Sequence, residues 1–287
     1  MNPGWDPAAA RPAMDPAMGS AMDPAAAQPV MSHAWDPAAV VAPCLAVALA
    51  AAYVLAAHRL RRRGDAWPQA WQASFTAGAA LLGVAFTVPG HTFTAHMAQH
   101  LMAGMLAPVL LVVGRPLTLT LRALRPGRAR RAVLAVTHSR PAGWVAAPAV
   151  AVVLDMGGLW LLYRTPLLAA AQHEPWLHAA VHVHVVAAGT LFAFAVCRLD
   201  PVRRRWSLPW RAGVLLLGGA AHAVLAKTLY ATPPPGTWFT TGDLRAGAQL
   251  MYYGGDLAEL ALAIVLAAQW YAAGGRALRR AAARAGQ

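Results

Sequence analysis

Long apolar stretches separated by short polar segments dominate the pattern of this chain. Seven of these stretches are long enough to cross roughly 30 Å of hydrocarbon as helices. They lie near residues 38–57, 70–88, 95–114, 142–163, 178–197, 212–230 and 249–271. Because 58% of the residues are hydrophobic and only 12% are charged, the chain has too few polar residues for the surface of a soluble domain. The sequence predicts an all-α fold, a polytopic membrane helix bundle of seven transmembrane helices.

The arginines and lysines outside the predicted helices assign its orientation. The segments on the side of the N-terminus carry 3 of them in total, and the segments on the other side carry 20. Since positive charge is retained on the cytoplasmic side, we expect the N-terminus outside and the C-terminus in the cytoplasm. The net charge of +13 suits anionic membrane lipid. We expect no nucleic acid partner, because the arginines are dispersed over short loops without interleaved aromatic residues.

Composition divides the chain into three parts, which are an extracytoplasmic tail over 1–37, a membrane domain over 38–272 and a short basic cytoplasmic tail over 273–287. The first tail is rich in Pro and Ala, which predicts disorder, and lacks the basic start and apolar core of a cleavable signal peptide. It also holds half of the ten methionines. Those methionines either capture copper transiently or are an accident of composition.

Two predicted helices begin with a pair of histidines one turn apart. His96 and His100 open the third helix, and His178 and His182 open the fifth. Both helices run inward, so both pairs lie on the outer side of the membrane. The thioethers Met97 and Met102 flank the first pair, whereas His184 points to a different face of its helix.

Further ionisable groups lie in the outer half of the other predicted helices. Such groups are costly in lipid and usually face a bundle interior, a partner or a cavity. They are Asp155, His222, Lys227, Asp256 and Glu259. Each has a simpler explanation when taken alone; Lys227, for example, can extend to the membrane surface or pair with Asp256. Together with the histidine pairs, they predict a metal site that opens outward.

Imidazole with nearby thioether favours copper, with zinc next. The cysteines, Cys44 and Cys197, lie in predicted helices without a CxxC partner and offer no thiolate site. Haem held between His100 and His182 is an alternative, and would make the protein a membrane redox protein. A copper permease is a further alternative, although the inner halves of the helices carry almost no ionisable or methionine residues. The chain contains no catalytic signature, so we expect no enzyme activity.

One stretch around the first histidine pair carries a family resemblance. The run His96-Met97-Ala98-Gln99-His100-Leu101, followed by Ala107-Pro108 and Gly114-Arg115-Pro116-Leu117, resembles the bacterial CtaG-type (caa3-type) cytochrome c oxidase assembly proteins. The segment from His178 to His182, followed by Gly189-Thr190-Leu191-Phe192, is similar to the second histidine pair of that family. The resemblance covers roughly residues 45–272.

This resemblance implies a multi-pass protein of the bacterial cell membrane that helps to mature the copper centre of a haem-copper cytochrome c oxidase. Its partner would be an oxidase subunit, and its cargo copper, as Cu(I), held at the outer-leaflet side. The candidate ligands are His96, His100, His178 and His182, with Met97, Met102 and His222 as alternates. Around them, Asp155, Asp256 and Glu259 would orient ligands or balance protons, and Lys227 would be a charge partner.

Overall fold

The computed structural model describes residues 37–89, 92–201 and 206–285, which form helices and no strands. The chain divides into the units Met1–Asp36 and Pro37–Gln287, and all described residues lie in the second. The tail predicted over 1–37 therefore lies outside the described residues, except for Pro37. The helices are α1 (Pro37–Arg62), α2 (Gln69–Ala85), α3 (Phe93–His100), η2 (Leu101–Leu106), α4 (Ala107–Val113), α5 (Pro116–Ala123), α6 (Arg128–Thr137), α7 (Arg140–Val145), α8 (Pro148–Arg164), α9 (Leu167–His173), α10 (Pro175–Cys197), α11 (Leu208–Ala231) and α12 (Thr241–Ala285).

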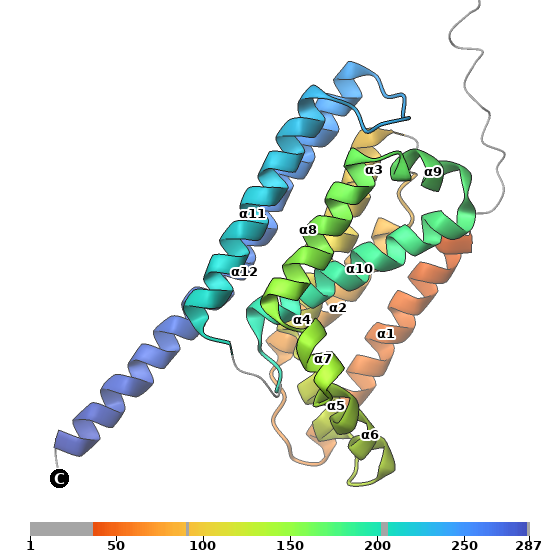
Figure 1. Cartoon of the computed structure of the whole chain (residues 1–287). Coiled ribbons are helices and arrows are strands. Elements are labelled where there is room, and N and C mark those ends of the chain that lie inside the picture. The colour runs from red at the N-terminus through yellow and green to blue at the C-terminus, as the bar shows by residue number, and fades with distance from the viewer. Residues whose placement is uncertain (1–36, 90–91, 202–205, 286–287) are drawn as a thin grey trace, which may run out of the picture. The chain divides into compact units, whose positions relative to one another are not determined.

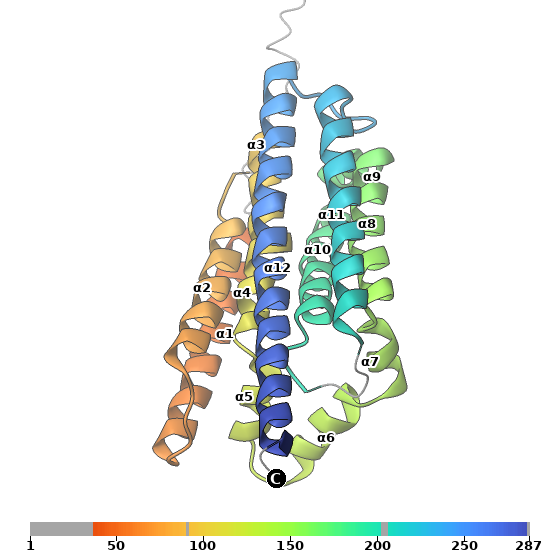
Figure 2. The same cartoon turned by 90° about the vertical axis from the view of Figure 1, so that its left-hand side faces the viewer.

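The long helices lie side by side. The start of α3, α9 and the turn from α11 to α12 lie at one end of the bundle, which we call the α3 end (Figure 1). The short helices α5, α6 and α7 lie at the opposite end, the α5 end, as the second view confirms (Figure 2). The basic ends of α1 and α5 meet there, where Arg122 pairs with Asp65 at 3.1 Å.

Five described helices are long and apolar enough to cross a membrane. They are Val40–Arg62, Phe93–Val113, Pro175–Cys197, Leu208–Ala231 and Thr241–Arg276. A sixth candidate is α8 followed by α9, which are bent by 77° at the break between them. The predicted span 142–163 starts later than expected, because α7 ends at Val145 and a new helix begins at Pro148. The basic segment predicted as a tail from 273 continues α12 without a break to Ala285.

The helix that carries His96 and His100 widens into a π-helix directly after the second histidine. Pro108 has no N–H, so it cannot donate the α-helical hydrogen bond to the carbonyl of Gly104. Instead, the N–H of Ala107 donates to the carbonyl of Met102, five residues back. The structure thus shows a wider helical turn directly before Pro108.

This wide turn packs directly against α10. A Cβ atom added to Gly189 would collide with the carbonyl oxygen of Gly104. The two backbones can therefore approach this closely only because residue 189 is glycine. The contact fixes α10, with His178 and His182, against the helix that carries His100.

Gly189→Ala should lower the free energy of unfolding by about 1–3 kcal/mol, since the new methyl group has to push the helices apart. Gly157→Ala is the matched control, because it lies in the middle of α8 with nothing within 4 Å of its Cβ position. Thermal unfolding in detergent measures both variants. Equal melting temperatures for the two would contradict the close contact.

The first turn of α3 is held by a carboxylate from α12. The N–H of Phe93 donates to Oδ2 of Asp243 at 2.7 Å, and the N–H of Thr94 donates to Oδ1 at 3.0 Å. The hydroxyl of Thr94 donates to the same Oδ1 at 2.7 Å. These donors are among those that a helix start leaves without intrahelical partners. Asp243 therefore fixes the position of the helix that carries His96.

Asp243→Ala should lower the free energy of unfolding by about 1.5–3 kcal/mol, the range for hydrogen bonds to a charged group. Asp65→Ala is the control, because it removes an exposed acid whose ion pair with Arg122 contributes about 0–1 kcal/mol. The comparison is again made by thermal unfolding. If Asp65→Ala cost as much as Asp243→Ala, the carboxylate would have no special role in holding α3.

Candidate functional site

Five polar side chains from four helices meet below the α3 end. His96 and His100 come from α3, Tyr163 from α8, His222 from α11 and Glu259 from α12. His96 Nε2 shares a hydrogen bond of 3.0 Å with the hydroxyl of Tyr163. The rings of His100 and His222 are stacked, with centroids 6.2 Å apart and an angle of 27° between their planes. We call these five residues the histidine cluster.

Glycines on the facing helix make room for two members of the cluster. A Cβ at Gly255 of α12 would collide with the imidazole of His222, and a Cβ at Gly219 of α11 would collide with the carboxylate of Glu259. The side chain of His222 on α11 therefore packs on the backbone of α12, and the side chain of Glu259 on α12 packs on the backbone of α11. As a result, His222 Nδ1 lies 3.8 Å from Glu259 Oε1, within ion-pair range but too far for a direct hydrogen bond.

Three ring nitrogens of the cluster are buried without a hydrogen-bond partner among the described residues. They are both nitrogens of His100 and Nε2 of His222. The two residues are 7% and 1% exposed. Buried polar atoms are nearly always paired, because an unpaired one costs about 1–3 kcal/mol. Such imidazole nitrogens are suited to bind a further group, and a transition-metal ion such as copper or zinc is one that imidazole binds well.

The second histidine pair lies beside the cluster on α10. The rings of His178 and His182 are 4.3 Å apart, and His182 Nδ1 lies 2.9 Å from the carbonyl oxygen of His178. Both are half-buried, and both lie close enough to His96 for their charges to interact. His184 points elsewhere, as predicted, with Nε2 at 3.2 Å from the carbonyl oxygen of Leu154 in α8.

Both predicted thioether ligands lie on the helix of the first histidine pair. Met97 is completely buried in the larger hydrophobic cluster, and Met102 is half-buried in the π-helix. Asp155 is half-buried on α8, about 12 Å along the helix axis from Tyr163.

Asp256 and Lys227 are exposed on neighbouring helices, and the described residues contain no ion pair between them. The ammonium of Lys227 lies 5.5 Å from the ring centre of Tyr252. Among the described residues, Glu259 is the one predicted acid that lies within ion-pair distance of a histidine of the cluster.

Tyr163 was not predicted as a site residue. The available signal was a tyrosine at the end of the fourth apolar segment, near the expected depth of the histidine pairs. The glycines that accommodate His222 and Glu259 were also missed.

The described residues contain no group of three or more His, Cys, Asp and Glu side chains already arranged to hold a metal ion. The donors are nevertheless of the right kind, and several are unpaired. Cu(I) accepts low coordination numbers and imidazole ligands, whereas structural zinc requires four ligands as a rule. The cluster therefore offers imidazole donors without the complete four-ligand set that a structural zinc site requires.

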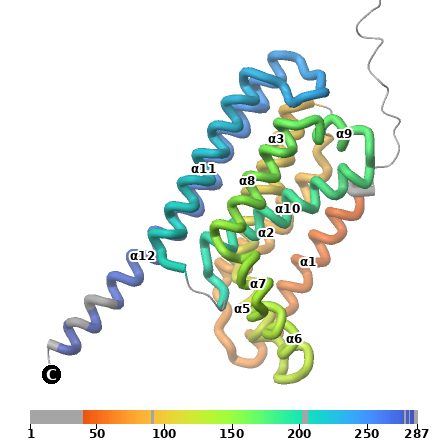
Figure 3. Tube along the Cα trace, viewed as in Figure 1, coloured from red at the N-terminus to blue at the C-terminus, as the bar shows by residue number. Residues whose placement is uncertain are grey.

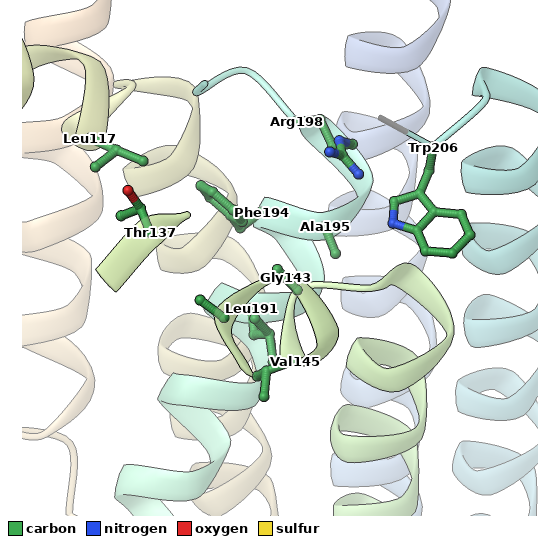
Figure 4. Close-up of a pocket in the computed structure, with 11 residues that line it drawn as sticks. Leu117, Thr137, Gly143, Val145, Leu191, Phe194, Ala195, Arg198 and Trp206 are labelled. Carbon is green, nitrogen blue, oxygen red and sulfur yellow. The ribbon is translucent and has the colours of Figure 1, made fainter. Parts of the chain in front are cut away.

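A separate cavity of about 240 Å³ lies at the α5 end. Its wall comes from α5, α6, α7, α10 and Trp206, and includes none of the predicted site residues (Figure 4). It is almost entirely apolar, with Arg198 at one side. Its position and lining separate it from the histidine cluster.

Comparison with known proteins places this arrangement in a family. The chain is 34% identical over 194 residues to uncharacterised proteins of Mycobacterium bovis and Mycobacterium tuberculosis, covering 64% of this chain and 29% of theirs. An uncharacterised protein of Mycobacterium leprae is 28% identical over 250 residues, covering 78% of this chain and 38% of its own length. The chain thus spans less than two fifths of each of these relatives. No solved structure matches it. Residues 51–273 match Caa3_CtaG, so the chain belongs to this family of cytochrome c oxidase caa3 assembly factors.

Proposed function

We propose that this protein assists the assembly of a haem-copper cytochrome c oxidase by holding Cu(I) and delivering it to an oxidase subunit. The observation that carries the proposal is the set of unpaired, buried nitrogens on His100 and His222. A cation bound there would remove the cost of leaving them unpaired. Membership of the family indicates that the process is oxidase assembly. The choice of copper as the ion rests on the chemistry of the imidazole donors. The role requires no catalysis.

The proposed orientation in the bacterial cell membrane has the α3 end outside. It rests on the arginines, which gather at the ends of predicted helices that share the cytoplasmic side. The five candidate spans and the bent α8–α9 pair support a multi-pass protein. The helix α2, with 17 residues and a length of about 26 Å, would complete seven spans. The histidine cluster would then lie in the outer leaflet.

The two histidine pairs have different roles in this proposal. His178 and His182 are half-buried and would receive the ion from outside. His96 is hydrogen-bonded to Tyr163, is within electrostatic range of that pair and lies one turn before His100 on α3. His100 and His222 would retain the ion, and the carboxylate of Glu259 would balance its charge.

The exposed face of α12 is the proposed docking surface for the oxidase subunit. Asp256 is exposed there, one turn from Glu259. A carboxylate facing hydrocarbon costs about 2.5–3.5 kcal/mol, so a partner helix that donates a hydrogen bond to it would be favoured. Docking at this face would bring the partner next to the carboxylate that contacts His222.

Replacing His100 and His222 together by alanine should abolish near-stoichiometric Cu(I) binding, because it removes all three unpaired nitrogens. The control replaces the exposed residues His58 and His173 by alanine, which deletes two imidazoles outside the cluster. Metal analysis of the purified protein after Cu(I) loading under reducing conditions measures both variants. Equal copper content in the two would rule out the cluster as the binding site, and a Soret band in the wild type would favour a haem protein instead.

Gly255→Ala should weaken Cu(I) binding roughly 10–100-fold although it removes no ligand, because the added methyl group displaces the imidazole of His222. Gly242→Ala on the same helix is the control, with nothing within 4 Å of its Cβ position. Titration against a Cu(I) chelator gives the two affinities. Unchanged affinity in Gly255→Ala would show that His222 does not hold the ion.

A further inference from the structure

Two cations lie on the seam between α11 and α12, close to the α3 end. The two helices run side by side at one edge of the bundle (Figures 1 and 2). The ammonium of Lys227 on α11 lies 5.5 Å from the ring centre of Tyr252 on α12. In the opposite direction, the guanidinium carbon of Arg245 on α12 lies 5.4 Å from the ring centre of Tyr230 on α11. These two cation–π contacts hold both charges over the same seam.

Neither charge is neutralised by an acid. Lys227 and Arg245 are exposed, and neither forms an ion pair or a hydrogen bond with another residue in the described part of the chain. Asp243, two residues before Arg245, accepts hydrogen bonds from the first turn of α3. Asp256 is exposed one turn beyond Tyr252 and is not in ion-pair range of Lys227. The N–H groups of both cations are therefore available to an anion from outside the chain.

The exposed surface of both helices continues from these cations as an apolar stripe toward the α5 end. Its large side chains are Leu216, Leu217 and Val224 on α11 and Leu257, Leu260 and Ile264 on α12. Both helices are candidate membrane spans. Lys227 lies four residues before the end of α11 and Arg245 four residues after the start of α12, about 6 Å from each helix terminus. Long basic side chains this close to the end of a span extend to the headgroups, where lipid phosphates lie.

We propose that the seam binds one anionic phospholipid, with its phosphate at Lys227 and Arg245 and an acyl chain along the apolar stripe. The stripe favours a lipid over a soluble anion, because it gives the acyl chain a surface directly beside the phosphate. The ring contacts already restrict both cations, so less side-chain entropy is lost when the phosphate binds. Binding would stabilise the pair of helices that carries His222 and Glu259. The lipid site uses no residue of the histidine cluster and does not depend on copper.

The test is native mass spectrometry of the full chain in detergent with added dioleoylphosphatidylglycerol or dioleoylphosphatidylcholine. Lys227→Gln and Arg245→Gln, singly and together, remove the charges and keep long polar side chains. Arg164→Gln is the matched control for each single variant, because it removes an exposed arginine at the end of α8, outside the seam. The double variant Lys227→Arg/Arg245→Lys exchanges the two side chains and keeps both charges. Thermal unfolding identifies the variants that remain folded.

Wild type, Arg164→Gln and the exchanged variant should retain the same number of phosphatidylglycerol molecules. Each single glutamine variant at the seam should weaken the binding of one of them roughly fivefold, and the double variant about 30-fold, from about 1 kcal/mol for each basic residue at a membrane surface.

The double glutamine variant should therefore carry one lipid fewer than the wild type. An unchanged number in this variant, when folded, would overturn the proposal, and so would loss of the lipid from the exchanged variant. Equal retention of phosphatidylcholine by the wild type would overturn the anionic headgroup. Displacement of the lipid by excess inorganic phosphate would show that the seam takes a soluble anion instead.

Discussion

The packing of polar side chains against glycine backbone is the interaction on which the rest of this bundle depends. In hydrocarbon an imidazole or carboxylate needs a partner inside the bundle, and helices with side chains on both surfaces stay too far apart to provide one. Gly219 and Gly255 let Glu259 and His222 cross the interface between α11 and α12. Gly189 lets the backbone of α10 approach the backbone of the π-helix closely. Without these glycines, His222 and Glu259 could not reach across to the neighbouring helix, and α10 could not approach the π-helix this closely.

Two aspartates fix the ends of the same bundle by one physical device. Asp243 accepts hydrogen bonds from the first turn of α3, and Asp200 accepts them from the first turn of α5. Both carboxylates come from helices or turns far away in sequence, so each joins distant parts of the chain. One junction lies at the histidine end and the other beside the apolar cavity. Each of the two sites is thereby positioned by a buried or half-buried carboxylate rather than by a loop of its own.

The sequence predicted helix positions well and helix rotation less well. Apolar length places the helices, and the i, i+4 spacing correctly puts His96 and His100 on neighbouring turns of one helix. The pairing of His100 with His222 could not be derived, because α10 and α11 are apolar on nearly all sides and their pattern does not say which face meets which neighbour. Tyr163 was missed for the same reason. The π-helix depends on a carbonyl left free by Pro108 and on a glycine in another helix, which no local pattern encodes.

One helix runs through the molecule without interruption. At 45 residues, α12 is about 68 Å long, more than twice the roughly 30 Å of a hydrocarbon core (Figure 3). The residues that contact His222 and α3 lie in its first half, and a basic rod continues beyond the start of α11. Because a continuous helix resists bending, a tilt of the basic rod would move the wall of the histidine cluster with it. The two ends of the bundle are in this way connected through a single rigid element.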